Sequence, residues 1–100
     1  MIISINARRW FQKYYGNTYH SVTVHVDGKF IAYMPFAYGY GEQYMQTAHF
    51  ILQNAGIYPR TDKRLKSGVS EDWYNFCQDK RNGKHQFVIN CTDVARKKDL

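Results

Sequence analysis

The stretch that decides the fold is Ser21-Val22-Thr23-Val24-His25-Val26-Asp27-Gly28-Lys29-Phe30-Ile31. Valine alternates with polar residues before Asp27, a pattern that is typical of a strand with one buried face. Asp-Gly between two such runs predicts a two-residue hairpin turn, because both turn residues must accept a positive φ. The cross-strand pairs that this turn predicts are Val26 with Lys29, Val24 with Ile31, and Val22 with Tyr33.

Alternation also predicts strands on either side of this hairpin. Residues 2–12 alternate, and Tyr15-Gly16-Asn17-Thr18 is a turn that leads into the valine-rich strand. Pro35 ends the third strand or sets its end at a sheet edge, since proline cannot donate to the ladder. Residues 85–91 alternate once more and predict a last strand.

Two segments between these strands have helical spacing instead. Apolar residues recur at intervals of three or four over residues 42–55, and Gly56 is a natural helix stop. A shorter helix is predicted over residues 70–80, with Ser70 as its N-cap and acidic residues in its first turn.

The predicted order is β-β-β-α-α-β, and the predicted fold class is α+β, a single antiparallel β-sheet with two helices on one face. With 100 residues, the chain is expected to form one domain spanning 1–100, with residues 96–100 as a frayed tail.

We find no apolar run that would span a bilayer and no signal-peptide pattern, so we expect no membrane association and a cytoplasmic location. Cys77 and Cys91 are expected to be reduced and buried.

Charge and aromatic content favour a binding function. Fourteen Lys and Arg residues against eight Asp and Glu give a net charge of +6, and aromatic residues reach 17%. Twelve of the seventeen aromatic residues lie in residues 1–50, whereas ten of the fourteen basic residues lie in residues 60–100. The two kinds interleave only over residues 8–15. Cations meet phosphates and rings stack on bases, so this stretch favours nucleic acid or another phosphate-rich ligand; ordinary solubilising charge is the other interpretation.

The residues predicted for that ligand are Arg8, Arg9, Trp10, Lys13, Tyr14, Tyr15, Arg60, Lys63 and Arg64. A second set of aromatic residues lies close together in the chain and predicts a partner interface, because tyrosine is a favoured interface anchor. The same rings would otherwise complete the core or be covered in a homodimer. This second set is Tyr33, Phe36, Tyr38, Tyr40 and Tyr44.

We find no residue pattern that indicates catalysis, a metal or a cofactor, and we predict a non-enzymatic protein with none of these. The HxH, HxxxH, HExxH and CxxC spacings are all missing, as is a nucleophile elbow. Gly39-Tyr40-Gly41 precedes a helix but lacks the further glycine and the lysine of phosphate-binding loops. Two interpretations of this segment remain open, a phosphate-binding loop (a phosphate cradle) and a flexible turn.

The segments 7–13 and 16–22 resemble small proteins encoded by tailed bacteriophages, and so does Tyr38-Gly39-Tyr40-Gly41 followed by Gln46-Thr47-Ala48. The resemblance covers about residues 5–58 and implies a phage-encoded accessory protein in the host cell cytoplasm, with no catalytic residues. A weaker resemblance, in the order of elements around residues 24–29, is to the double-stranded-RNA-binding domain. The lysines that begin that family's helix are replaced here by Glu42-Gln43-Tyr44-Met45-Gln46.

We therefore expect a small phage-encoded module that binds nucleic acid or a phosphate-rich ligand without catalysis. The alternative is an anti-defence protein, similar in action to an anti-CRISPR, that inhibits a host protein by stoichiometric binding.

Overall fold

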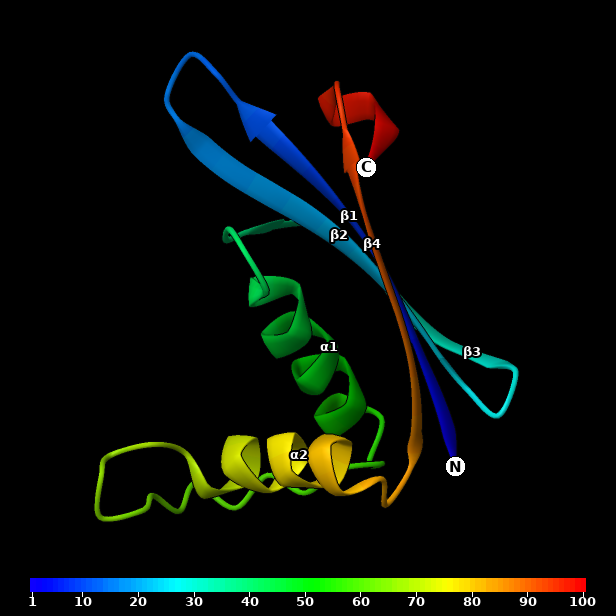
Figure 1. Ribbon diagram of the computed structural model, residues 1–100, viewed down its shortest axis with the longest axis vertical. Coiled ribbons are helices and arrows are strands. Elements are labelled where there is room, and N and C mark those ends of the chain that lie inside the picture. Colours follow the sequence, from blue (N-terminus) through cyan, green and yellow to red (C-terminus); the bar gives the residue numbers. More distant parts are fainter.

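Four strands form one twisted sheet, and both helices lie on the same side of it (Figure 1). The computed structural model describes residues 1–100, and it confirms the α+β class with one sheet and two helices. The elements in chain order are β1 (Ile2–Gln12), β2 (Asn17–Val26), β3 (Lys29–Tyr38), α1 (Gln43–Asn54), α2 (Glu71–Asn82), β4 (Gln86–Val94) and a 3-10 helix (Lys97–Asp99).

The sheet is mixed, so the prediction of a purely antiparallel sheet was wrong. The order of strands is β3-β2-β1-β4, with β4 beside β1 and parallel to it, from Ile2 opposite Gln86 to Trp10 opposite Val94. The predicted order also differs from the structure in lacking the terminal 3-10 helix. The direction of β4 follows from the helices, which return the chain to the end of the sheet where β1 begins. Gln86 N donates to Met1 O there, at 3.0 Å.

The Asp27-Gly28 turn forms as predicted, but the register beyond it does not. Asp27 has φ 52° and Gly28 has φ 80°, and Val26 lies opposite Lys29. A register shift between His25 and Val24 then sets Val24 opposite Ala32 and Val22 opposite Met34. The predicted pairs with Ile31 and Tyr33 are therefore wrong, because a bulge inserts one residue and exchanges the faces of those that follow.

The core lies between the helix side of the sheet and the two helices. Alternate residues of β1 and β2 are fully buried there, as are Leu52 of α1 and Phe76 of α2. Phe76 packs edge-on against Phe87 of β4, with ring centroids 5.6 Å apart. Neither α1 nor α2 lies on the opposite face of the sheet, which we call the open face (Figure 1).

Both predicted helices are confirmed. α1 lies within the predicted range, and α2 begins after Ser70, whose Oγ accepts a hydrogen bond from Trp73 N at 3.4 Å. Cys77 and Cys91 are free thiols and only partly buried. Neither helix is long and apolar enough to cross a membrane.

Where a frayed tail was expected, the last residues lie across the open face. Arg8 Nη1 donates to Asp99 O at 3.0 Å, and the Tyr33 hydroxyl donates to Leu100 O at 3.2 Å. Since Arg8 belongs to β1 and Tyr33 to β3, these contacts carry the tail over the middle of the sheet.

Candidate nucleic-acid interface

Three aromatic rings from three adjacent strands form a row on the open face. Trp10 of β1 and Tyr19 of β2 lie directly opposite each other, with centroids 5.8 Å apart and planes at 25°. Tyr19 stacks on Phe36 of β3 at 4.6 Å and 18°. Cross-strand aromatic pairs of this kind stabilise a sheet, typically by about 0.5–1.5 kcal/mol beyond their burial. We call these three residues the aromatic row.

Basic side chains flank the aromatic row on two sides. Arg8 is exposed on the same face of β1 as Trp10. Lys97, from the C-terminal 3-10 helix, sets its ammonium 4.9 Å from the centroid of the Phe36 ring. Lys97 was not among the predicted residues, because it is 61 positions away from Phe36 in the sequence and no local pattern joins them.

The turn between β1 and β2 extends the same end of the sheet. Lys13 is exposed there, and the rings of Tyr14 and Tyr15 are 86% and 69% exposed. The two rings contact each other edge to face, with centroids 4.7 Å apart. In Figure 1 this hairpin projects well beyond the helices, at the top of the view. Five of the predicted residues, Arg8, Trp10, Lys13, Tyr14 and Tyr15, thus lie at one end of the molecule.

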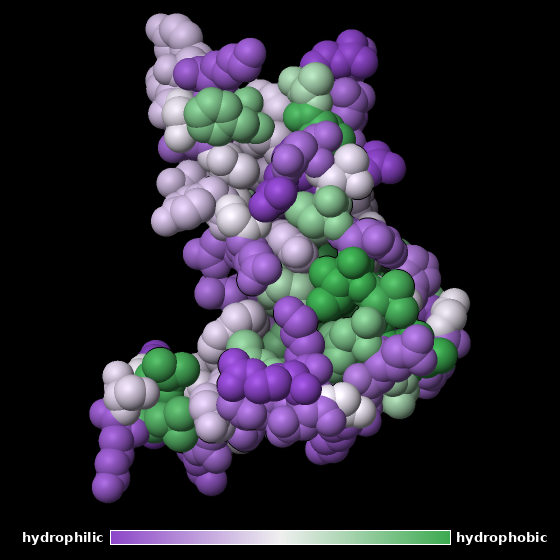
Figure 2. Space-filling view, viewed as in Figure 1, coloured by the Kyte–Doolittle hydropathy of each residue, from purple (hydrophilic) through white to green (hydrophobic).

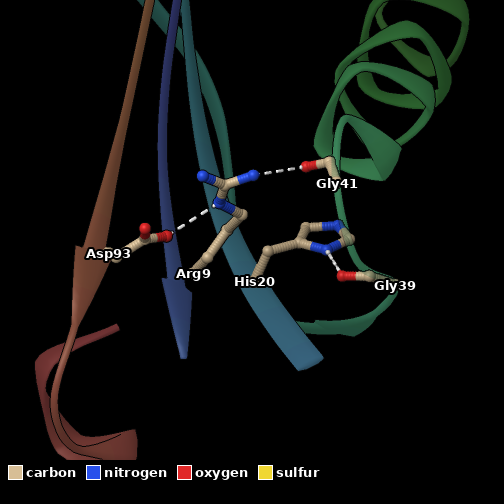
Figure 3. Close-up of polar contacts among 5 residues, drawn as sticks. All are labelled: Arg9, His20, Gly39, Gly41 and Asp93. Carbon is tan, nitrogen blue, oxygen red and sulfur yellow. Dashed lines mark hydrogen bonds and ion pairs between the residues drawn. The ribbon is translucent and has the colours of Figure 1, made fainter. Parts of the chain in front are cut away.

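The Arg9 side chain points to the helix side of the sheet, where its guanidinium already has two hydrogen-bond partners. Its Nε donates to Asp93 Oδ1 at 2.9 Å, and its Nη1 donates to Gly41 O at 2.9 Å (Figure 3). The charge of Arg9 is therefore neutralised by a neighbouring carboxylate, and its guanidinium holds the loop that leads into α1.

His20 holds the same loop from the adjacent strand. Its Nδ1 lies 3.3 Å from Gly39 O (Figure 3). Its Nε2 lies 2.7 Å from Thr47 Oγ1. A carbonyl can only accept, so Nδ1 carries the proton and the threonine hydroxyl donates to Nε2. Burial lowers the pKa of His20 below its usual value. Gly39 N in turn donates to Thr18 O at 3.0 Å. These contacts fix Gly39-Tyr40-Gly41 as a turn, whereas the sequence interpretation was a flexible turn or a phosphate cradle.

The second predicted basic cluster lies at the opposite end of the molecule. Arg60, Lys63 and Arg64 belong to the long loop before α2, at the bottom of Figure 1, whereas the β1–β2 hairpin is at the top. Asp72 anchors this loop by accepting from Thr61 N and Thr61 Oγ1, both at 2.7 Å. The same hydrogen bonds hold the pKa of Asp72 below its usual range. The fold therefore does not join the two basic clusters into one surface.

The aromatic residues predicted as a partner interface are also divided. Tyr44 is 8% exposed and belongs to the core, and its burial raises the pKa of its hydroxyl. Tyr33 and Phe36 lie on the open face with the tail. Tyr38 is 67% exposed and joins these two on the open face, because its ring lies edge to face with the central ring of the aromatic row, with centroids 5.7 Å apart. Tyr40 is 75% exposed and lies in the loop after β3. These five residues do not form one continuous patch.

A polar cavity of about 440 Å³ adjoins Arg8 on the open face, and sequence reasoning missed it. Its side chains are mainly amides and hydroxyls, which can both donate to and accept from the edge of a base. Polar residues alternate with apolar ones along β1 and β4, so the polar ones share one face of the sheet. This pattern is the sequence signal for the polar lining of the cavity. The lining residues that matter here are Asn6, Arg8, Thr23, Tyr33, Asn90 and Thr92.

Comparisons of this chain with protein-family models, with characterised proteins and with solved structures returned no match. The chain contains no group of three or more His, Cys, Asp or Glu side chains placed to hold a metal ion.

Proposed function

We propose that this protein binds single-stranded nucleic acid on the open face of its sheet, at the end where the β1–β2 hairpin projects. The observation that supports the proposal is the return of Lys97 to the aromatic row, 4.9 Å from the Phe36 ring, on the same face as Arg8. Phosphates attract cations, and unpaired bases gain from contact with aromatic rings. A surface that offers both, and that α1 and α2 leave uncovered, fits such a strand.

Each group of side chains on this surface has a distinct role in binding. Arg8, Lys13 and Lys97 would contact phosphates. The rings of the aromatic row are stacked on one another, and Val94 of β4 lies opposite Trp10 on the same face, so a base would contact the outward edges of this row. Tyr14 and Tyr15 offer further ring surface at the hairpin tip, since both are largely exposed. Bases in a duplex are already stacked and paired, so the proposal favours a single strand over a duplex.

The role is that of a non-enzymatic accessory protein, and the resemblance of residues 5–58 to phage-encoded proteins supports a phage origin. The polar cavity beside Arg8 would receive the edge of one base.

The proposal is tested by fluorescence anisotropy with a labelled single-stranded oligonucleotide and its duplex, over a series of salt concentrations. Three phosphate contacts predict that the logarithm of the binding constant falls with the logarithm of salt with a slope of about −2, because each contact to a single strand contributes about −0.7. Lys97→Gln should reduce the slope by about 0.7. The matched control is Lys66→Gln, in the distant loop, which should leave the slope unchanged.

Stacking is tested by Tyr14→Ala, which should weaken binding by about 1–3 kcal/mol, or roughly 5- to 150-fold. Tyr74→Ala removes a tyrosine from α2 that is 45% exposed and should have no effect. The proposal fails if the anisotropy does not change at low salt, or if the Lys66 and Lys97 variants lose affinity equally.

A second proposed function, stoichiometric inhibition of a host protein, is favoured by the exposure of Tyr38 and Tyr40. Tyr40 borders a cleft of about 390 Å³ between α1 and α2, lined in part by Trp73 and Cys77. A host protein that the chain retains after nuclease treatment, and that Tyr40→Ala releases, would support this function. A partner that the nuclease itself releases would support the nucleic-acid function.

A further inference from the structure

The two edges of the sheet differ in their protection against pairing with another strand. β3, at one edge, begins with Lys29, contains Pro35 and has two register shifts against β2. Lysine, proline and bulges are the features by which proteins block edge-to-edge pairing. β4, at the other edge, runs for nine residues in continuous register with β1, contains no proline and has one charged residue, Asp93. The β4 edge is therefore open to a further strand.

The backbone of β4 presents a regular row of unpaired groups at this edge. Gln86 N donates to Met1 O, and alternate residues of a strand bond to the same neighbour in a parallel ladder. Gln86 and the even-numbered residues after it therefore bond to β1. It follows that the N–H and C=O groups of Phe87, Ile89 and Cys91 point away from β1, toward solvent.

The same three residues form an apolar strip on the helix side of the strand. Phe87, Ile89 and Cys91 are only partly buried and pack against the edge of the core. α1 crosses β1, β2 and β3, and α2 meets β4 through Phe76. In Figure 1 β4 passes in front of the other strands, and Figure 2, from the same direction, shows hydrophobic surface gathered beside the helices within a polar surround.

We infer that the protein forms a two-fold symmetric dimer in which β4 pairs antiparallel with β4 of a second copy. A symmetric pairing must match each residue with one on the same face of the sheet. The register that sets Ile89 opposite the partner's Ile89 does so. It also sets Phe87 opposite the partner's Cys91, so apolar residues meet each other. Asp93, which accepts from Arg9 within its own chain, then lies opposite the partner's His85.

The self-complementarity of β4 is what selects a second copy as the occupant of this edge. A register shifted to pair Asn90 with the partner's Asn90 would set the Phe87 ring against the partner's Asp93, an unfavourable contact for both. The preferred register joins the two apolar strips into one continuous strip across the two-fold axis. It also joins two four-stranded sheets into one of eight strands, with β3 at both outer edges.

This inference does not rest on the proposed nucleic-acid function, because the dimer uses the β4 edge and the helix side of the sheet. It is tested without nucleic acid, by sedimentation equilibrium over a wide range of protein concentration. The mass should rise from 11.9 kDa toward twice that value. Cys91→Pro should keep the chain monomeric, since it places a proline where the N–H faces the partner and not β1.

Cross-linking tests the register independently of that variant's folding. In a chain with Cys77→Ser and Cys91→Ser, Ile89→Cys should give a disulfide-linked dimer under mild oxidation. Directly opposite residues in a hydrogen-bonded antiparallel pair have Cα atoms about 5.5 Å apart, which suits a disulfide. Val88→Cys in the same background is the matched control and should not cross-link, because Val88 would face the partner's Asn90. A monomeric mass at every concentration, or equal cross-linking of both variants, would overturn the dimer.

Discussion

Gly39→Ala should destabilise this protein more than any other glycine substitution. Gly39 is buried in the loop that Arg9 and His20 hold, and it has φ 148°, a region that residues with a side chain rarely adopt. An added Cβ would lie 2.5 Å from Gln43 Cβ, 2.8 Å from Gln43 Cγ and 3.4 Å from His20 Cε1. The first of these contacts is far inside van der Waals distance and involves the root of a helical side chain.

The expected cost has two parts. Forcing alanine into this backbone region costs about 1–3 kcal/mol, and overpacking at a closed site costs about 1–3 kcal/mol more. The sum is about 2–6 kcal/mol, which is a large fraction of the stability of a small domain. Gly41→Ala is the matched control two residues away. Gly41 also has a positive φ, 61°, but an added Cβ would meet nothing within 4 Å, so only the left-handed backbone cost of about 1–2 kcal/mol remains.

Urea unfolding followed by circular dichroism and tryptophan fluorescence gives the free energy of unfolding for each variant. Gln43→Gly removes the clashing atoms, so adding Gly39→Ala to that variant should cost clearly less than adding it to the natural chain. Equal losses for Gly39→Ala and Gly41→Ala would refute the steric reasoning. So would a failure of Gln43→Gly to reduce the cost.

Three further predictions follow from buried groups. Burial lowers the pKa values of His20 and His49, so the unfolded chain binds protons more readily than the folded one. The free energy of unfolding should therefore be at its full value above pH 6.5 and should decrease as the pH drops below it. His49→Phe, which removes a titrating ring with an unpaired Nε2, should flatten that dependence in urea titrations at several pH values. Phe76→Ala empties a fully buried position at the contact of α2 with β4 and should lower the free energy of unfolding by about 3–5 kcal/mol, whereas Tyr74→Ala on the exposed side of α2 should change it little. Burial raises the pKa values of both thiols, so Cys77 and Cys91 should react slowly with a thiol reagent near pH 7 and faster after unfolding in urea; fast reaction in the folded chain would contradict this.

The elements that sequence reasoning predicted correctly are those set by near neighbours. Asp27-Gly28 forms a two-residue turn because its conformation depends on the two residues themselves. Ser70 caps α2 through a hydrogen bond to a residue three positions away. Arg8, Trp10, Lys13, Tyr14 and Tyr15 lie close together in space because they are close in the sequence.

The features that sequence reasoning missed depend on contacts between distant residues. The bulge at Ile31, where the register shifts between Val24 and His25, exchanges the faces of β3 and moves Tyr33 to the open face, and no residue there indicates it locally. Arg9 was predicted to bind a ligand, but it meets Asp93, which is distant in the sequence and lies opposite Arg9 only because β4 is parallel to β1. Lys97 reaches the aromatic row for the same reason, since β4 carries the tail to that end of the sheet.

Local patterns in the sequence were enough to predict the four strands, the two α-helices, the hairpin turn and the α+β class, because periodicity, caps and turn residues act over a few positions. The direction of β4, the basic cluster that joins the aromatic rings and the sheet edge that is left unprotected became clear from the folded structure. These depend on where two helices return the chain, and that is set by the packing of residues such as Phe76 and Phe87, which no local pattern connects.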